Sequence, residues 1–193
     1  MAEYLEIRWH GRGGQGAKTA ALLLGESAAA AGKYIQAFPE YGPERMGAPV
    51  VAFNRISDEP ITVHCHVKEP KYVVVLDPTF VGSVDFTDGV PEDGAIIINT
   101  DRSPEEMRKR LGLEESSIKV YTVNATRIAQ ETIGRAIPNT PMMGALVGAT
   151  GLLEIEALLE DTRRKLEKKF RNKPEVIDGN IQAIQRAYEE VQG

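Results

Sequence analysis

The sequence predicts a three-layer α/β/α domain with a mixed β-sheet and a C-terminal helical tail, formed by all 193 residues as a single domain. Strand-like and helix-like patterns alternate as far as residue 123, which is typical of helices packed on both faces of a largely parallel sheet. From residue 124 onward the apolar spacing is helical. Residues 1–123 are therefore expected to form the sheet core, and residues 124–193 a mainly helical part.

The first elements expected along the chain are a strand, a glycine turn and a helix. Residues 5–9 alternate apolar and polar side chains, residues 11–16 contain four glycines, and residues 17–31 are rich in Ala and Leu. Alternation at every second position is typical of a half-buried strand, and the Ala/Leu-rich run ends at a glycine, as helices often do. A second strand is expected at 34–38, where Pro39 breaks the pattern.

Five further strands are expected in the middle of the chain. The β-rich runs 49–56 and 61–65 flank four turn-forming residues, which predicts that they pair as an antiparallel hairpin. The run 72–76 is apolar on both faces, as a central strand covered by helices would be. Two more strands are expected at 95–98 and 118–123.

Capping residues and apolar spacing predict the later helices. Ser103 as the cap, with Pro104 and two acids after it, is a typical helix start. A second start at Thr140 leads into an apolar helix through residue 148. Apolar residues at helical spacing predict two more helices, within 155–170 and 177–191.

Composition and charge exclude several classes of protein. The chain is 42% hydrophobic and 26% charged, with a net charge of −5, which excludes a disordered or collagen-like chain and argues against a basic nucleic-acid surface. One cysteine, Cys65, excludes an internal disulfide and a four-cysteine iron–sulfur or zinc site. No apolar run approaches the roughly 18 residues of a membrane span, and the N-terminus does not resemble a signal peptide. We expect a soluble, cytoplasmic protein that binds neither nucleic acid nor membrane.

The glycine-rich turn is the first candidate binding site. Gly11, Gly13, Gly14 and Gly16, with Gln15 between the last two, satisfy the pattern G-x-G-x-x-G after a strand and before a helix. Glycine lets the backbone approach a ligand closely, and a helix start offers unpaired N–H groups with partial positive charge. The residues therefore favour a phosphate or another polar ligand here, the alternative being a tight turn that binds nothing.

The standard partners of two nucleotide families are missing around this turn. A dinucleotide site has an acid about 20 residues further on, at the end of the second strand, but residues 34–38 contain none. A P-loop needs Lys directly after its last glycine, whereas Gly16 is followed by Ala17 and then Lys18. NAD binding and nucleotide hydrolysis are therefore minority interpretations.

A second candidate loop spans residues 38–49 and carries Tyr41, Glu44 and Arg45. If a helix crosses between the first two strands, those strands run parallel, and this loop lies at the same sheet edge as the glycine turn. Loops of this length are uncommon unless they are functional. We expect a binding or docking loop, the alternative being a long surface connection.

Other residues are weaker candidates for a functional site. His64 and His66 would share one face of a strand with Cys65 on the other, so the three do not converge on a metal. Asp77 closes the apolar strand and either binds a ligand or caps the next turn. The pair Gly144 and Gly148 predicts a close helix-packing face, or a surface that admits a partner.

These motifs, taken together in order, resemble the gamma subunit of the 2-oxoacid:ferredoxin oxidoreductases, and the likeness covers nearly the whole chain. The residues that carry it are 11–16 after a strand, 39–45, 55–58, 139–145 and the late pattern Asn180, Ala183, Tyr188. Within the family, the pyruvate:ferredoxin oxidoreductases (pyruvate synthases) look most similar. The implied function is the gamma subunit of such an enzyme, contributing to coenzyme A binding and to complex assembly.

The resemblance implies a reaction in which a 2-oxoacid, coenzyme A and oxidised ferredoxin give acyl-CoA, carbon dioxide and reduced ferredoxin. It places thiamine diphosphate, Mg and 4Fe-4S clusters on the alpha, beta and delta subunits of a heterotetramer, so that this chain alone binds no cofactor and is inactive in isolation. Ferredoxin is the implied electron acceptor of the complex. The single cysteine agrees with a subunit that carries no cluster.

The resemblance also implies roles for individual residues. Gln15 and the backbone around it would meet polar or phosphate groups of coenzyme A, Arg45 would pair with a phosphate, and Tyr41 would pack on the adenine or the pantetheine arm. None would transfer a proton, because the cofactor supplies the difficult chemistry. The expected binding residues are Gly11, Gly13, Gly14, Gln15, Gly16, Tyr41, Glu44, Arg45, Asn124 and Asn139.

Three alternatives stay open. The same role in a 2-oxoisovalerate, 2-oxoglutarate or indolepyruvate oxidoreductase is the first, because the sequence leaves the 2-oxoacid undetermined. The second is a stand-alone Rossmann-like nucleotide-binding module. The third is an assembly subunit whose pocket is unused.

Overall fold

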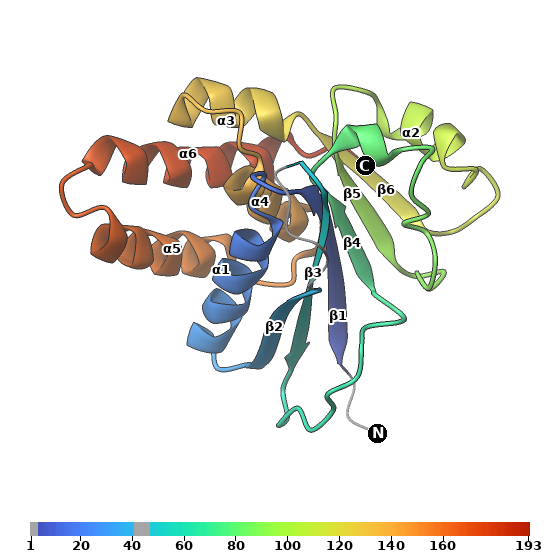
Figure 1. The fold of residues 1–193 in the computed structure, drawn as a ribbon, viewed down its shortest axis with the longest axis horizontal. Helices are drawn as coiled ribbons and strands as arrows, with labels where there is room; N and C mark the ends of the chain where they lie inside the picture. The colour runs from blue at the N-terminus through green and yellow to red at the C-terminus, as the bar shows by residue number, and fades with distance from the viewer. Residues whose placement is uncertain (1–3, 41–46) are drawn as a thin grey trace.

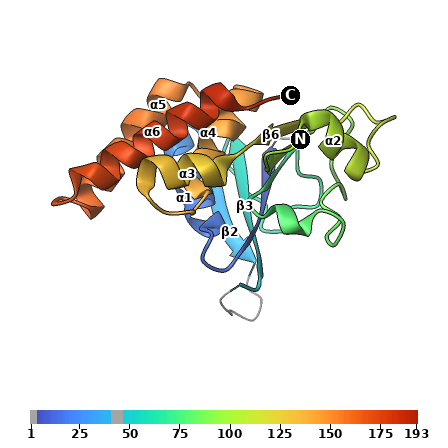
Figure 2. The same ribbon diagram turned by 90° about the horizontal axis from the view of Figure 1, so that it is seen from above.

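The computed structural model describes residues 4–40 and 47–193, and it forms one mixed sheet with helices on both faces (Figures 1 and 2). The strands are β1 (Leu5–Arg12), β2 (Tyr34–Glu40), β3 (Pro49–Ser57), β4 (Tyr72–Val75), β5 (Ala95–Asn99) and β6 (Lys119–Val123). The helices are α1 (Ala17–Ala30), η1 (Pro78–Phe80, a 3₁₀ turn), α2 (Pro104–Arg110), α3 (Ala125–Ile133), α4 (Asn139–Thr150), α5 (Ile155–Lys169) and α6 (Pro174–Glu190). The predicted fold class is confirmed.

The strand order is β2-β3-β1-β4-β5-β6. Strands β1, β4, β5 and β6 are parallel neighbours, whereas β3 runs antiparallel to both β1 and β2. Strand β3 therefore lies between the first two strands of the chain, and all strands except β3 end at the same edge of the sheet.

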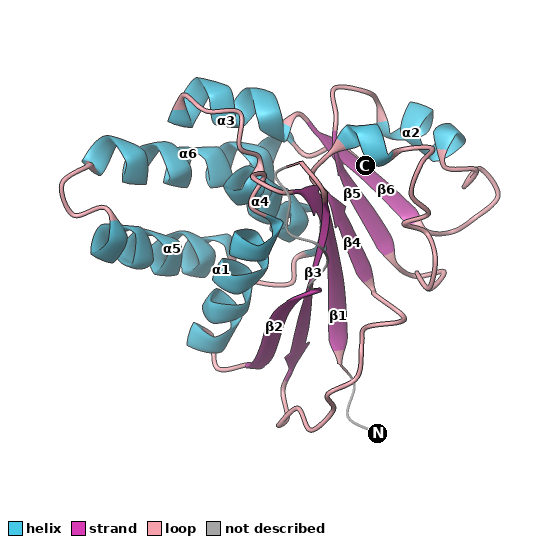
Figure 3. Ribbon diagram, viewed as in Figure 1, coloured by secondary structure: helices cyan, strands magenta, loops and turns pink. Residues whose placement is uncertain are grey.

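The predicted hairpin of 49–56 with 61–65 is wrong. Strand β3 pairs along its length with β1 on one side and β2 on the other, so neither of its edges is open to a third strand. Residues 61–65 form no strand, and the connection from β3 to β4 is drawn as a loop in Figure 3. Backbone carbonyls of this segment accept hydrogen bonds from side chains instead: Val63 from Gln36 at 2.9 Å, and Cys65 from Arg55 at 2.7 Å.

The main core lies between the sheet and the layer formed by α1, α3, α4, α5 and α6. Trp9 is completely buried there, and its indole N–H donates to the Asn54 side chain at 2.8 Å. The Asn54 amide in turn donates to the carbonyl of Ala21 in α1 at 2.7 Å, so a satisfied polar bridge joins β1, β3 and α1. A smaller core on the opposite face packs under η1 and α2.

Helix α4 packs against α6 through glycine. A Cβ atom on Gly144 would lie 2.1 Å from the carbonyl oxygen of Ile184, and one on Gly148 would lie 2.6 Å from that of Tyr188. Glycine is therefore required for this close approach, and the predicted packing face is confirmed. The predicted start of α2 is confirmed as well, because the Ser103 side chain accepts from a first-turn N–H at 3.2 Å.

Gln192 pairs with one residue on the outer edge of β6. The N–H of Thr122 donates to the carbonyl of Gln192 at 2.8 Å, and the N–H of Gln192 donates back at 2.9 Å. Residues 4–40 and 47–193 contain no helix that is long and apolar enough to cross a membrane.

Candidate functional site

The candidate site lies at the edge of the sheet where the parallel strands end. The glycine loop, residues 11–16, follows β1, whose two neighbours are the antiparallel β3 and the parallel β4. In open α/β sheets, ligands bind outside the carboxyl ends of the strands, at the point where the strand order reverses. The fold therefore places the glycine loop where such sheets bind their ligands.

Two glycines set the path of this loop. Gly14 has a φ of 99° and Gly16 a φ of 82°, conformations that residues with a Cβ rarely adopt. Gly16 is the N-cap of α1, and among residues 4–40 and 47–193 no side chain accepts from the first-turn N–H groups of that helix. The start of α1 therefore keeps the partial positive charge that favours an anion.

Asn139, the first residue of α4, lies directly against the loop. A Cβ on Gly16 would lie 2.7 Å from the Asn139 side-chain nitrogen, whereas a Cβ on Gly14 would have no atom within 4 Å. The structure thus brings Asn139 together with the glycines of the predicted site.

Replacing Gly16 by Ala should destabilise the chain by about 1–3 kcal/mol more than replacing Gly14 by Ala. Both substitutions introduce a side chain at positive φ, but only the first pushes on Asn139. Urea unfolding of the two variants measures the difference. Adding Asn139→Ala should recover part of the Gly16→Ala loss and none of the Gly14→Ala loss, and equal recovery in both would contradict the packing described.

The second candidate loop is joined to the glycine loop where it returns to β3. The N–H of Gly13 donates to the carbonyl of Ala48 at 2.9 Å, and the N–H of Gly47 donates to the carbonyl of Gly13 at 3.3 Å. The predicted proximity of the two loops is therefore confirmed for residues 47–49. Tyr41, Glu44 and Arg45 lie outside the described residues, and their roles stay predictions.

An ionic cluster lies beside the glycine loop, and the sequence indicates only part of it. Asp77, just beyond the end of β4, accepts from the Arg12 guanidinium at 3.0 Å and from the Gln15 side-chain amide at 2.7 Å. Arg12 also donates to the Thr79 hydroxyl at 2.9 Å and lies 4.5 Å above the centre of the Phe80 ring. Arg12 is not among the expected binding residues, although it stands within the glycine motif.

Asp77 stays ionised although it is buried. Burial by itself raises the pKa of Asp77, but hydrogen bonds from the hydroxyl and the N–H of Thr79 oppose that effect. The Gln15 amide and the charge of Arg12 act in the same direction, so the net pKa lies below the ordinary value. Of the two open interpretations of this residue, the capping one is confirmed, because Asp77 caps η1 through the Thr79 N–H at 2.9 Å.

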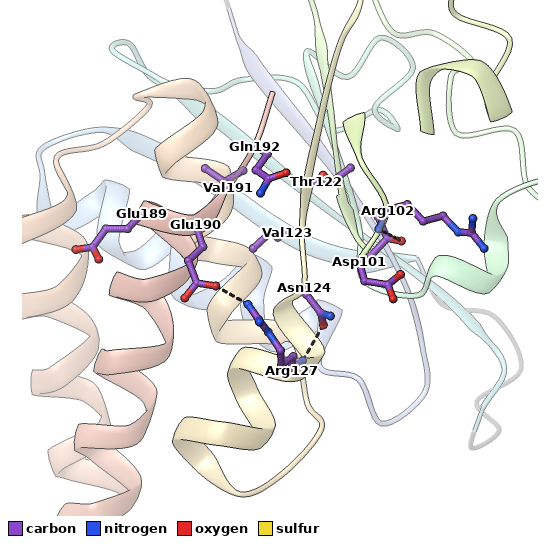
Figure 4. A pocket seen from close by; sticks show the side chains of 11 residues that line it. Asp101, Arg102, Thr122, Val123, Asn124, Arg127, Glu189, Glu190, Val191 and Gln192 are labelled. Atoms are coloured by element: carbon purple, nitrogen blue, oxygen red, sulfur yellow. Dashed lines mark hydrogen bonds and ion pairs between the residues drawn. The ribbon is translucent and has the colours of Figure 1, made fainter. Parts of the chain in front are cut away.

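Asn124 lies elsewhere on the same edge. It caps α3 by accepting from the N–H of Arg127 at 2.9 Å, and it lines a hollow of about 380 Å³ beyond β5 and β6 (Figure 4). Arg127 is held there by Glu190 at 2.8 Å. Strands β4 and β5 separate β1 from β6, which corresponds to roughly 14 Å at the usual strand spacing. The structure therefore does not bring Asn124 to the glycine loop.

Two of the three residues considered for a metal line a hollow that residues 11–16 do not line. His64 and Cys65 line a separate hollow of about 370 Å³ with Phe38 and Arg55. Within residues 4–40 and 47–193, no three His, Cys, Asp or Glu side chains cluster closely enough to hold a metal ion.

Fold and site together define a doubly wound α/β protein that presents a glycine loop at its strand-end edge. The family model for pyruvate ferredoxin/flavodoxin oxidoreductase matches residues 6–190, and the chain belongs to this family.

Two similar proteins and one crystal structure support the assignment to this family. Pyruvate synthase subunit PorC of Thermotoga maritima is 51% identical over 98% of this chain and 95% of its own length. The pyruvate/ketoisovalerate oxidoreductases common subunit gamma of Pyrococcus abyssi is 46% identical over 97% of each chain. The crystal structure of pyruvate oxidoreductase subunit PORC from Thermotoga maritima matches with a TM-score of 0.85 and 49% identity over 98% of both chains. This chain is accordingly a gamma-type subunit of an oxidoreductase complex.

A likeness in fold extends to a larger protein. A 2-oxoglutarate:ferredoxin oxidoreductase from Magnetococcus marinus, solved with 2-oxoglutarate, coenzyme A and succinyl-CoA bound, matches 98% of this chain and 31% of its own chain. The TM-score is 0.74 at 21% identity, so the likeness is one of fold.

Proposed function

We propose that this chain serves a pyruvate:ferredoxin oxidoreductase, where it contributes to coenzyme A binding and to complex assembly while pyruvate is oxidatively decarboxylated to acetyl-CoA. The observation that carries the proposal is the glycine loop, docked on residues 47–48 at the strand-end edge, in a chain 51% identical to a pyruvate synthase subunit. Alpha, beta and delta subunits would carry thiamine diphosphate, Mg and 4Fe-4S clusters, and ferredoxin would accept the electrons of the complex, in the cytoplasm.

The loop suits the phosphates of coenzyme A. Gly14 is exposed, and no atom of the described residues lies within 4 Å of where its Cβ would stand, so a ligand can approach the backbone there. The start of α1 adds N–H groups that no described side chain caps. Asn139 borders the same surface. This chain would place the coenzyme A thiol toward the thiamine-bound acyl group on a companion subunit, and none of its residues would transfer a proton.

A second substrate assignment is favoured by one observation. The Pyrococcus abyssi relative is named as the common gamma subunit of pyruvate and ketoisovalerate oxidoreductases. The same coenzyme A role in a 2-oxoisovalerate oxidoreductase is therefore the alternative, and the choice of 2-oxoacid would be made on other subunits.

Coenzyme A should slow backbone hydrogen exchange in residues 11–20 and 47–50 of the assembled complex. Arg45→Ala should raise the KM for coenzyme A about tenfold or more, because a charge-assisted hydrogen bond to a phosphate is worth about 1.5–3 kcal/mol. The KM for pyruvate should not change. Arg110→Ala, on the exposed side of α2, is the control and should leave both values unchanged.

Two outcomes would contradict this proposal. An intact complex with unchanged exchange in the loop and unchanged kinetics in Arg45→Ala would indicate that the chain serves assembly alone. Tight binding of NAD, FAD or ATP by the isolated chain, measured by calorimetry, would indicate a stand-alone nucleotide-binding module.

A further inference from the structure

We infer that Asp77 is a positioning residue for coenzyme A: it holds the glycine loop in its binding shape through Gln15 and Arg12, without contacting the ligand itself. This inference rests on the proposed function and adds to it a residue that lies 62 positions from Gln15 in the sequence. Asp77 reaches the loop because β4 is the parallel neighbour of β1, so that both strands end side by side.

The two carboxylate oxygens of Asp77 serve two different segments. One oxygen, Oδ1, accepts from the N–H of Thr79 at 2.9 Å and from its hydroxyl at 2.5 Å, which fixes the carboxylate at the start of η1. The other, Oδ2, accepts from the Gln15 amide at 2.7 Å and from the Arg12 Nε at 3.0 Å. The carboxylate is therefore anchored on its own turn and connects that turn to the glycine loop.

The oxygen and the nitrogen of the Gln15 side-chain amide both form hydrogen bonds. Its oxygen accepts from the N–H of Arg12 at 2.7 Å, while its nitrogen donates to Asp77. The backbone N–H of Gln15 donates to the carbonyl of Arg12 at 3.0 Å, which closes the turn. A side chain used in this way sets the shape of the loop, which differs from the direct ligand contact expected from the sequence.

Arg12 extends the same support to the second loop. Besides Asp77, its guanidinium donates to the Thr79 hydroxyl at 2.9 Å and to the carbonyl of Gly47 at 3.2 Å. One cation thus joins the turn after β4, the glycine loop and the return of the second loop. Because Asp77 is the only carboxylate that pairs with Arg12 among the described residues, its removal would loosen all three segments together.

The experiment uses the assembled complex and reverses the polarity of one hydrogen bond. Asp77→Asn leaves a single side-chain oxygen, whereas the wild-type carboxylate accepts from Thr79 with one oxygen and from Gln15 and Arg12 with the other. The new amide nitrogen therefore faces one of these two sets of donors. Gln15→Glu alone places two carboxylates against each other. When both substitutions are combined, the new carboxylate at position 15 accepts from the new amide at position 77 and from the backbone N–H of Arg12, whereas the Arg12 Nε loses its acceptor at position 77. This double variant therefore restores the donor–acceptor match between positions 15 and 77, at unchanged net charge.

We expect Asp77→Asn to raise the KM for coenzyme A about tenfold, with kcat at saturating coenzyme A and the KM for pyruvate unchanged. Backbone exchange at residues 13–16 should accelerate in parallel. The double variant should recover part of both effects, through the restored bond between positions 15 and 77. Asp85→Asn is the matched control, because Asp85 makes the same cap onto Thr87, at 3.0 and 2.6 Å, away from the loop.

Three results would overturn the inference. The first is an unchanged KM and unchanged loop exchange in Asp77→Asn. The second is a raised KM that the double variant leaves raised although loop exchange is restored, because Gln15 would then contact coenzyme A directly. The third is an equal effect in Asp85→Asn. If coenzyme A protects no part of the wild-type loop, the proposed function fails, while loop exchange in the wild type and the variants still tests the positioning role.

Discussion

Replacing Gly144 by Ala should cost about 3 kcal/mol or more in the free energy of unfolding. The new Cβ would lie 2.1 Å from the carbonyl oxygen of Ile184, and backbone cannot move aside as a flexible side chain can. Helices α4 and α6 would have to separate at a contact that is completely buried. In an open helix the same substitution stabilises by about 1 kcal/mol, so the expected sign is reversed here.

Urea or thermal unfolding of the purified chain measures this effect. Ala149→Gly, five residues along the same helix and only partly buried, serves as the control for helix propensity and should cost about 1 kcal/mol. A Gly144→Ala variant as stable as the wild type would mean that α4 and α6 do not approach as closely as described.

Lowering the pH from 7 to about 4 should remove about 3 kcal/mol of stability through His10 alone. Burial, followed by the positive charge of Arg8, lowers the pKa of His10 to about 4 from an ordinary value of 6.5. His10 is only 7% exposed, and its Nε2 has no hydrogen-bond partner among the described residues. The unfolded chain therefore takes up the proton at a higher pH than the folded chain does.

The direction of the effect follows from that difference in proton binding. Between pH 6.5 and 4 the unfolded state binds the extra proton. Stability therefore falls as the pH falls through this window, by about 1.4 kcal/mol for each pH unit that separates the two pKa values. Denaturant unfolding from pH 7.5 to 4 measures the slope. His10→Leu removes the titrating group, and a slope equal to that of the wild type would show that His10 is not the group responsible.

The parts of the fold that local pattern determines could be predicted from the sequence. The run 72–76, apolar on both faces, contains the central strand β4, and the cap at Ser103 starts α2. The hairpin failed because pairing depends on distant partners. Strand β3 takes β1 and β2 as its neighbours, although 61–65 is nearer along the chain.

The candidate site, too, could be predicted from the sequence only in part. The glycine loop and its proximity to residues 47–48 could be inferred, because the ends of parallel strands meet at one edge. The pairing of Arg12 with Asp77 could not, since 65 positions separate them and only the strand order makes them neighbours. Asn124 caps α3, as an Asn directly before a helix commonly does, and its contact with the ligand stays a prediction.

The short bridge between Thr122 and Gln192 bears on how this chain should be handled. Unpaired strand edges can recruit strands from other molecules and so lead to aggregation. Gln192 covers part of that edge on β6, and a Cβ on Gly193 would lie 2.0 Å from the Tyr121 ring. A residue with a side chain at position 193 would crowd this contact and expose the edge, so variants prepared for study should keep Gly193.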